Sequence, residues 1–387
     1  MFQRIVITIL GIAIGLAGGY LIILLSTPKT SKKVQQSIFS PQKREVVGFL
    51  PFWLIDKADK DYSPFITTLS YFNLNVDGNG TIKRMDNQVE ADPGWNALTS
   101  GKANDLLTKA KSAQEKLSLT MFASDIDIIN SLLADPVTNA QNLITDVSPV
   151  MQKYGFTDLN MDIEQIPDAS PEAQIKYSQF ISNIKDGLNS RNLGSLTVDI
   201  SPIAFVRNKN LIDPKLISPY VDYIVLMAYD FHNPGSLVTG PVSPVSGAGK
   251  VSEFDTETAI QKALEIFPAS KIILGIPLYG YSWESIDNFP RAAIVPSTAI
   301  IISNRTVEDL IANCATCSAQ YDTTDKESHL IYKNTDTGTF QQIFYPDQRA
   351  TQDKVDLANN YNLGGVALWA LGYEGNTILQ PLSAYHR

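Results

Sequence analysis

The chain has 387 residues, of which 44% are hydrophobic and 18% are charged. This composition excludes a mostly disordered protein and suits one large globular domain or two ordinary ones. The formal net charge of -9 and the pI near 4.9 argue against binding nucleic acid or another polyanion through a general basic surface. A neutral or modestly charged partner is therefore expected.

The N-terminus departs from this composition. Residues 5–25 run for 21 positions without a charge, which is long enough for a helix to span a bilayer. Because a cleaved signal peptide usually has a shorter apolar core of about 7 to 15 residues, we expect a transmembrane signal anchor over residues 1–27, with a cleaved signal as the alternative. Gly11, Gly15 and Gly19 repeat a spacing that pairs membrane helices, but glycine is common in such helices anyway, so they predict at most a weak dimer.

Residues 28–45 are polar and contain two prolines, which predicts a linker. The lysines that follow the apolar run would favour a cytoplasmic domain by the positive-inside rule. Long domains are translocated regardless of such charges, so this rule does not decide the orientation.

Cys314 and Cys317 are the only cysteines of the sequence. Two are too few for a structural zinc site or a disulfide framework. A local disulfide and two free thiols both stay open, and a redox centre would require this pair to open a helix after a strand, a pattern that the sequence lacks.

Short β-branched runs alternate with helical patterns from Val46 onward. Eight such runs begin near residues 46, 67, 117, 157, 196, 221, 271 and 364. Alternating strands and helices predict a parallel sheet, and eight repeats favour an α/β fold closed as a (β/α)8 TIM barrel over residues 46–387, with an open doubly wound sheet as the alternative. The long gap before the eighth run contains two β-like runs around a turn and predicts a small α+β insertion at about 284–350, between strands seven and eight.

The fourth run, in GFTDLNMDIEQIPD, has polar residues at every second position from Asp158 onward. Residues two apart face the same side of a strand, so Asn160, Asp162 and Glu164 project together. Glu164 falls at the carboxyl end of the strand, which is the active-site face of a barrel. Acids at a strand end are often solvated or cap the next helix, but three polar groups on one face of a buried strand would be costly without partners. We interpret them as functional residues.

Carboxyl groups held close together are what cleavage of a glycosidic bond requires. One must stay protonated to donate to the leaving oxygen, while its neighbour stays ionised. Glu164, which has the longer side chain and the terminal position, is the predicted acid, and Asp162 is the predicted neighbour.

The segment FTDLNMDIE resembles the strand-four signature D-G-x-D-x-D-x-E of glycoside hydrolase family 18, the chitinase-like family. The likeness extends over about residues 46–375 through VVGFLPFW, LMAYDFH, ILGIPLYGYSW and NLGGVALWALG. It is strongest toward the bacterial spore-lysin-like members that act on peptidoglycan. The combination of segments is specific, although each segment alone is not.

This resemblance implies retaining, substrate-assisted hydrolysis of β-1,4 bonds next to N-acetylglucosamine, with no metal or organic cofactor. Glu164 would protonate the glycosidic oxygen, while the acetamido carbonyl of the substrate attacks the anomeric carbon. Asp162 would orient the acetamide, Tyr229 would hydrogen-bond its oxygen, and Asp230 would help to place the sugar. Asn160 stands where many members have an aspartate, and the lost charge is expected to change the pH profile.

Several aromatic residues are candidate substrate contacts, because apolar faces of sugars stack on aromatic rings. Trp369 ends the eighth run, where the family places a tryptophan under the sugar in the cleaving subsite. Trp53 lies at the end of the first run, and Tyr279 and Trp283 follow the seventh. A tryptophan in a barrel is more often a core residue, and a lone histidine such as His232 is more often structural.

Three functions stay open from the sequence: a hydrolase, a catalytically silent lectin-like protein on the same barrel, and a structural or signalling module of the cell envelope. The presence of Glu164, Asp162 and Tyr229 favours the hydrolase, because lectin-like members commonly lose the acid. The branch resemblance favours peptidoglycan over a chitin-like glycan as the partner. We therefore expect the domain outside the cytoplasm, at the cell membrane, or secreted if the helix is removed.

Overall fold

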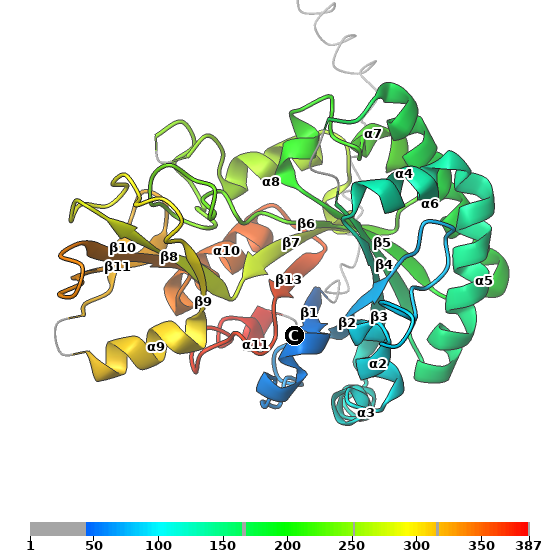
Figure 1. Ribbon diagram of the computed structural model, residues 1–387, viewed down its shortest axis with the longest axis horizontal. Helices are drawn as coiled ribbons and strands as arrows, with labels where there is room; N and C mark the ends of the chain where they lie inside the picture. The colour runs from blue at the N-terminus through cyan, green and yellow to red at the C-terminus, as the bar shows by residue number, and fades with distance from the viewer. Residues whose placement is uncertain (1–43, 165–167, 251, 315–316, 386–387) are drawn as a thin grey trace, which may run out of the picture. The chain divides into compact units, whose positions relative to one another are not determined.

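The structure is a computed structural model that describes residues 44–164, 168–250, 252–314 and 317–385. The chain divides into two units, Met1–Gln42 and Lys43–Arg387, and the described residues all lie in the second unit. Figure 1 shows the arrangement of its helices and strands.

Strands and helices alternate along most of the described chain. In chain order they are β1 (Glu45–Pro51), η1 (Phe52–Lys57), β2 (Thr68–Asn75), α2 (Pro93–Thr99), α3 (Asn104–Ser112), β3 (Lys116–Ala123), α4 (Ile126–Ala134), α5 (Pro136–Tyr154), β4 (Asp158–Ile163), α6 (Pro171–Arg191), β5 (Ser195–Ile200), η2 (Pro202–Phe205), α7 (Pro214–Ile217), β6 (Tyr223–Leu226), α8 (Thr256–Leu264), η3 (Ala269–Lys271), β7 (Ile272–Pro277), β8 (Tyr279–Ser285), β9 (Ile300–Ser303), α9 (Asn304–Asn313), β10 (Gln320–Asp322), β11 (Glu327–Lys333), β12 (Phe340–Tyr345), α10 (Gln348–Asn360), β13 (Gly365–Trp369) and α11 (Leu382–Tyr385).

Within the described residues, eight strands close a barrel in the order β1-β13-β7-β6-β5-β4-β3-β2, and every neighbouring pair is parallel. Helices such as α3, α6, α8 and α10 pack outside the strands (Figure 1). The apolar residues of β4, Leu159, Met161 and Ile163, join the core between barrel and helices, and its polar residues face the barrel interior.

The boundaries of the helices around β4 follow local sequence signals. Helix α5 ends at Gly155, whose φ of 75° is a left-handed conformation that suits glycine. Helix α6 begins at Ser170, whose side chain accepts a hydrogen bond from the backbone N–H of Ala173, with Pro171 as its first residue. These two ends fix where β4 begins and where the chain turns back over the barrel.

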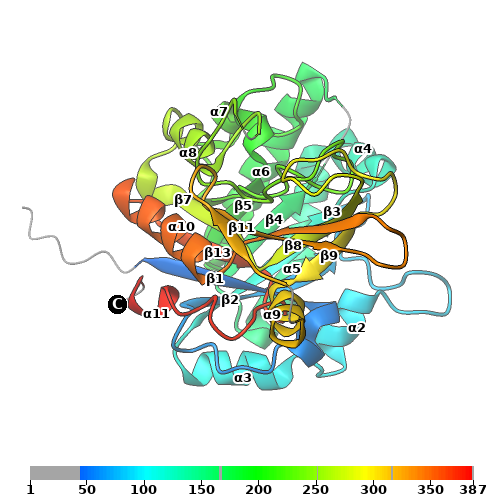
Figure 2. The same ribbon diagram turned by 90° about the vertical axis from the view of Figure 1, so that its left-hand side faces the viewer.

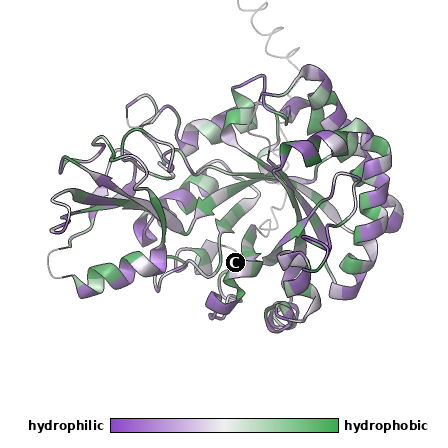
Figure 3. Ribbon diagram, in the orientation of Figure 1, coloured by the Kyte–Doolittle hydropathy of each residue, from purple (hydrophilic) through white to green (hydrophobic). Residues whose placement is uncertain are grey.

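A second, antiparallel sheet is inserted between barrel strands β7 and β13. Its five strands in the described chain have the order β10-β11-β12-β8-β9, and β8 follows β7 almost directly. Figures 1 and 2 show this sheet with α9 beside the barrel. Figure 3 shows that the barrel strands are largely hydrophobic, whereas the helices and the inserted sheet carry both hydrophobic and hydrophilic residues.

A buried ion pair joins three elements around the inserted sheet. Glu327 of β11 accepts hydrogen bonds from the backbone N–H groups of Val242 and Ser243, at 2.6 and 2.9 Å, in the segment between β6 and α8. The Nζ of Lys354 on α10 lies 4.0 Å from the same carboxylate, and neither side chain is exposed. The pair holds the segment after β6, which includes Tyr229 and Asp230, against the inserted sheet at Val242 and Ser243.

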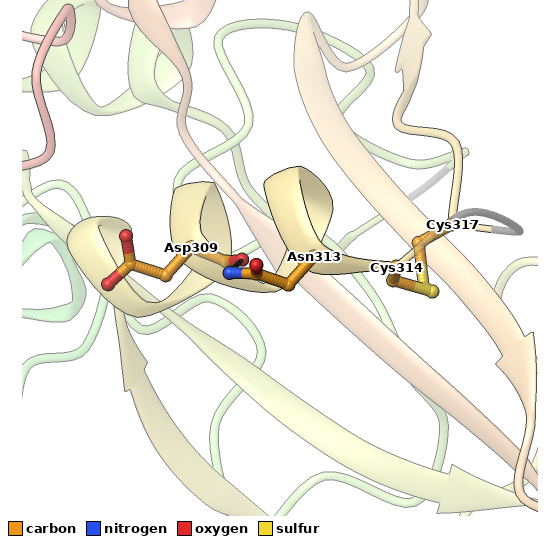
Figure 4. The surroundings of a disulfide bond; sticks show 4 residues. All are labelled: Asp309, Asn313, Cys314 and Cys317. Carbon is orange, nitrogen blue, oxygen red and sulfur yellow. Dashed lines mark hydrogen bonds between the residues drawn. A yellow bond between two sulfur atoms is a disulfide. The ribbon is translucent and has the colours of Figure 1, made fainter.

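The two cysteines form a disulfide at the C-terminal end of α9. Figure 4 shows Cys314 and Cys317 beside Asn313, whose side-chain amide donates to the backbone carbonyl of Asp309 at 2.8 Å. Of the alternatives left open by the sequence, the structure has the local disulfide.

The expected fold class requires a correction at its N-terminal end. In the part of the chain that the structure describes, no helix is long and apolar enough to cross a membrane. The expected membrane helix, residues 5–25, and the expected pairing positions Gly11, Gly15 and Gly19 lie outside the described residues. No finding supports membrane anchoring or dimerisation. The architecture that stands is the closed parallel barrel with its inserted antiparallel sheet.

Candidate active site

The polar row of β4 is distributed over the depth of the barrel. Asp158, at the amino end, accepts hydrogen bonds from the hydroxyls of Ser118, Ser195 and Thr197 at 2.6 to 2.9 Å. It is therefore part of a satisfied polar layer at the end of the barrel opposite the expected active site. The residues of the row that come after it approach the carboxyl end of the barrel.

Asn160 and Asp162 are buried in the barrel interior beside an acid of the next strand, Asp199 of β5. The side-chain amide of Asn160 donates to the Asp199 carboxylate at 2.8 Å. The Oδ1 atoms of Asn160 and Asp162 have no hydrogen-bond partner among the described residues. Buried oxygens are normally paired, so two unpartnered acceptors in the barrel interior are unusual.

The carboxyl groups repel one another and resist ionisation. Burial raises the pKa of Asp162 well above its usual range, and the carboxylates of Asp199 and Glu164 raise it further. Burial also raises the pKa of Asp199, although its hydrogen bond from Asn160 acts in the opposite direction. With two buried carboxyl groups side by side, the pair titrates as a unit and retains a proton at pH values where isolated acids are ionised.

Glu164 follows β4 at the rim of the barrel, and its side chain is accessible. Partial burial in the cleft and repulsion from the Asp230 carboxylate raise the pKa of Glu164. An accessible carboxyl group with a raised pKa is suited to donate a proton to a bound ligand.

Tyr229 and Asp230 follow β6 and face the same region. Asp230 accepts hydrogen bonds from the hydroxyls of Tyr279, at 2.5 Å, and Tyr281, at 3.0 Å. These bonds favour the ionised form and partly offset burial, which raises the pKa of Asp230. Tyr279 is only 2% exposed, so it contacts Asp230 from within the protein and does not form part of the open surface.

A cavity of about 420 Å³ opens in front of these acids. Its lining residues are Phe52, Trp53, Phe72, Asn73, Asn75, Phe122, Asp162, Glu164, Asp199, Met227, Tyr229, Asp230 and Trp369. The rings of Phe72 and Trp369 contact edge to face, with centroids 4.5 Å apart, and Trp53, which is 46% exposed, contacts Phe72 at 5.8 Å. We call this space the aromatic cavity.

A second cavity, of about 330 Å³, shares Glu164, Asp199, Met227, Tyr229 and Asp230 with the aromatic cavity. The two cavities form one cleft with the acid Glu164 in both walls. The second cavity contains no tryptophan and extends along the segment that follows β5.

Comparison with known proteins identifies this arrangement. The family model described as glycosyl hydrolases family 18 matches residues 41–374. The chain belongs to this family. It is therefore a glycoside hydrolase, and the resemblance read from the sequence is confirmed.

The glycoside hydrolase is similar to a cortical fragment-lytic enzyme of Bacillus cereus, with 26% identity over 90% of this chain and 74% of that protein. It is also similar to a class V chitinase of Arabidopsis thaliana, with 25% identity over 69% of this chain and 71% of that protein. Its fold matches the Bacillus megaterium spore cortex-lytic enzyme SleL, with a TM-score of 0.69 and 21% identity over 89% of this chain and 74% of that one. The group IV chitinase of Ostrinia furnacalis has a TM-score of 0.74 at 18% identity, over 89% of this chain and 99% of that one. The spore-lysin-like likeness is thus also confirmed.

Among the sequence-predicted residues of the hydrolase, Asp162, Glu164, Tyr229, Asp230, Trp53 and Trp369 line the aromatic cavity. Asn160 and Tyr279 lie behind it and contact Asp199 and Asp230. Their roles in catalysis and binding stay predictions, but the structure brings them together.

Trp283 is the exception, and its predicted substrate contact requires a correction. Its side chain is 0% exposed and packs between Tyr281 and Phe344 in the core of the inserted sheet. A ring covered on all sides has no face for a sugar, so Trp283 is a core residue. His232 is also buried, and its Nδ1 donates to the carbonyl of Pro241 at 2.9 Å, which is a structural role.

Sequence reasoning missed Asp199 and Tyr281. On β5, Thr197 and Asp199 alternate with Leu196 and Val198, the same pattern that drew attention to β4, but a single acid carried too little weight. Tyr281 gave no signal, because its contact with Asp230 depends on how β8 leaves the barrel.

In the described residues, no group of three or more histidine, cysteine, aspartate or glutamate side chains is arranged to hold a metal ion.

Proposed function

We propose that this glycoside hydrolase cleaves β-1,4 bonds next to N-acetylglucosamine in peptidoglycan by a retaining, substrate-assisted mechanism. The observation that carries the mechanism is the Asp162 carboxyl group in the lining of the aromatic cavity, beside Glu164 and Tyr229. This acceptor matches the N–H group of an acetamide on a sugar that stacks on Trp369.

In the first step, the carboxyl proton of Glu164 moves to the glycosidic oxygen as the bond from that oxygen to the anomeric carbon breaks. The acetamido oxygen forms a bond to the anomeric carbon, giving an oxazolinium ion, and the leaving sugar departs as an alcohol. Asp162 accepts the N–H hydrogen bond and stabilises the positive charge that develops there. Tyr229 donates a hydrogen bond to the acetamido oxygen and holds it in line.

In the second step, the Glu164 carboxylate takes a proton from water. The water oxygen attacks the anomeric carbon from the side that the leaving sugar vacated and opens the oxazolinium ring. Two inversions at one carbon give net retention of configuration. Glu164 is reprotonated, so the cycle closes.

Peptidoglycan is proposed as the polymer because the matched Bacillus proteins are named as cortical fragment-lytic and spore cortex-lytic enzymes. We further propose that the hydrolase works outside the cytoplasm, where this polymer lies and where a disulfide such as Cys314–Cys317 persists. Alkylation of the native protein without reduction should then leave both cysteines unmodified, and modification of both would contradict this location.

The mechanism is tested by the configuration of the first product and by the need for the acetamide. Proton NMR during turnover should show the β-anomer appearing first. Removal of the N-acetyl group from the sugar on the non-reducing side of the cleaved bond should abolish cleavage. A first product of the α-anomer, or equal cleavage of the de-N-acetylated glycan, would overturn the substrate-assisted mechanism.

A further inference from the structure

The second cavity of the cleft differs in charge from the aromatic cavity. Its lining contains the acids Glu164, Asp168, Asp199 and Asp230. It also includes two cations, Arg207 and Lys209, in the segment between η2 and α7. The aromatic cavity is lined by no lysine or arginine among the described residues. In a chain with a net charge of -9, two cations at one end of the cleft indicate recognition of a negative group.

On the proposed mechanism, the two cavities lie on opposite sides of the bond that is cleaved. The acid must stand at the oxygen that joins the two sugars, and Glu164 lines both cavities. Asp162 and Trp369 line only the aromatic cavity, so the sugar that supplies the acetamide lies there. The second cavity therefore receives the leaving sugar.

The segment that carries the two cations is held in place by α6 and the residues before it. The side-chain amide of Gln174 donates to the backbone carbonyls of Asn208 and Asn210 at 2.9 and 2.6 Å. The backbone N–H of Ala169 donates to the carbonyl of Lys209 at 2.7 Å. Gln174 is itself buried, so the backbone next to both cations is held by a buried side chain and is not an unsupported surface loop.

The two cations have different electrostatic partners. The Nζ of Lys209 lies 3.1 Å from the carboxylate of Asp168, and both side chains are well exposed. Arg207 makes no ion pair with any carboxylate in the part of the chain that the structure describes. A ligand carboxylate would gain a planar, bidentate partner in Arg207, with Lys209 beside it as a second positive charge.

We propose that Arg207 and Lys209 bind a carboxylate carried by the leaving sugar. In peptidoglycan the sugar that follows N-acetylglucosamine bears a lactyl ether, which ends in a carboxylate or continues into an acidic stem peptide. In chitin the leaving sugar is neutral. This inference rests on the proposed function, and it assigns to the second cavity the choice between the two polymers.

The test compares the Arg207→Gln, Lys209→Gln double variant with the unchanged protein on three substrates. These are glycan strands with the stem peptide, strands from which an amidase has removed the peptide to leave the lactyl carboxylate, and chitin oligosaccharides of equal length. The ratio of kcat/KM on the strand that carries the bound carboxylate to kcat/KM on chitin should fall about tenfold in the double variant, since each exposed charge pair contributes a factor of a few. The ratio should fall less at high salt, because exposed charges are screened.

A matched control removes two positive charges from the other end of the barrel. Lys153 lies in the last turn of α5 and Arg191 in the last turn of α6, next to the amino ends of β4 and β5. The Lys153→Gln, Arg191→Gln variant has the same net charge as the double variant, and it should leave the substrate ratio unchanged. An equal fall of the ratio in both variants would show a general charge effect and overturn the proposal.

The two strand substrates separate the sources of the carboxylate. A fall confined to peptide-bearing strands assigns the cations to the stem peptide, and a fall on peptide-free strands assigns them to the lactyl group. An unchanged ratio on both strands overturns the inference while leaving the hydrolase intact. In the Glu164→Gln background, Kd ratios from calorimetry on the same ligands give the same comparison without turnover, so failure of the proposed function and failure of this inference are distinguishable.

Discussion

Asn160 donates a hydrogen bond from its side-chain amide to the carboxylate of Asp199, with 2.8 Å between Nδ2 and Oδ1. The bond crosses from β4 to β5 and holds a second buried acid next to Asp162. An acidic group that Asn160 does not supply, relative to the family signature, is therefore present on the neighbouring strand. Asp162 still has a carboxyl neighbour, but the neighbour comes from a different position.

This relationship predicts the effect of Asp199→Asn on the pH profile. The Asp199 carboxylate raises the pKa of Asp162, so its removal lowers that pKa. Asp162 must be ionised to stabilise the oxazolinium ion, so the acid limb of kcat/KM should move to lower pH. The profile of the variant, measured beside the unchanged protein, checks this, and an acid limb that stays in place or moves upward would show that Asp199 does not act on Asp162.

Asp230 depends on two tyrosine hydroxyls that the inserted sheet supplies. Tyr279→Phe removes the donor at 2.5 Å and is expected to raise the pKa of Asp230, because the lost hydrogen bond favoured the charged form. We expect kcat/KM to fall about tenfold, in line with loss of one hydrogen bond to a charged group. In a double-mutant cycle, Asp230→Asn should remove most of the effect of Tyr279→Phe. Fully additive effects would indicate that Tyr279 acts independently of Asp230.

Substitutions of the two tryptophans Trp369 and Trp283 are expected to have different effects, because Trp369 lines the aromatic cavity and Trp283 is a core residue. Trp369→Ala should raise KM strongly, because the ring lines the aromatic cavity. Trp283→Ala should instead lower the free energy of unfolding by about 3 to 5 kcal/mol, the usual cost of removing a buried large aromatic ring. Urea denaturation and steady-state kinetics on both variants test the separation, with Trp283→Phe as the conservative variant if the alanine form does not fold. If Trp283→Ala raised KM strongly while leaving the free energy of unfolding almost unchanged, Trp283 would again be a candidate substrate contact.

The buried ion pair between Glu327 and Lys354 predicts a stability effect with a simple internal control. Lys354→Met leaves the Glu327 carboxylate buried without its cation and should cost about 3 to 5 kcal/mol. Adding Glu327→Gln removes the uncompensated charge, so the double variant should recover much of that loss. Denaturation midpoints of the single and double variants measure this. A double variant less stable than Lys354→Met alone would contradict the electrostatic explanation.

Much of the site could be predicted from the alternation of polar and apolar residues along the strands. The alternation in β4 predicted that Asn160, Asp162 and Glu164 share a face, and the barrel places them in one row that ends at the cleft. The alternation does not show how far along the barrel axis each residue lies. Asp158 therefore looked equivalent to these residues, although it lies at the end of the barrel opposite the cleft. Asp199 followed the same alternation, and its importance depends on a contact between strands that sequence spacing alone does not show.

The inserted sheet limited prediction more than the barrel did. Trp283 follows the seventh barrel strand in sequence, and its ring is covered by packing that includes Phe344 of β12 and Val242. Tyr281 of β8 donates a hydrogen bond to Asp230, which lies 51 residues earlier in the sequence. Both outcomes depend on contacts between segments about fifty to sixty residues apart in sequence, which local patterns do not encode.

The most direct test of the account is release of reducing ends from purified peptidoglycan and from chitin oligosaccharides by residues 40–387, beside the Glu164→Gln variant. We expect the unchanged protein to cleave peptidoglycan. Turnover should fall at least about a hundredfold in the variant, the usual size of a general-acid contribution, while the variant still binds the glycan. Equal turnover by the two proteins would contradict the assignment of Glu164 as the acid, and with it the mechanism proposed for this cleft.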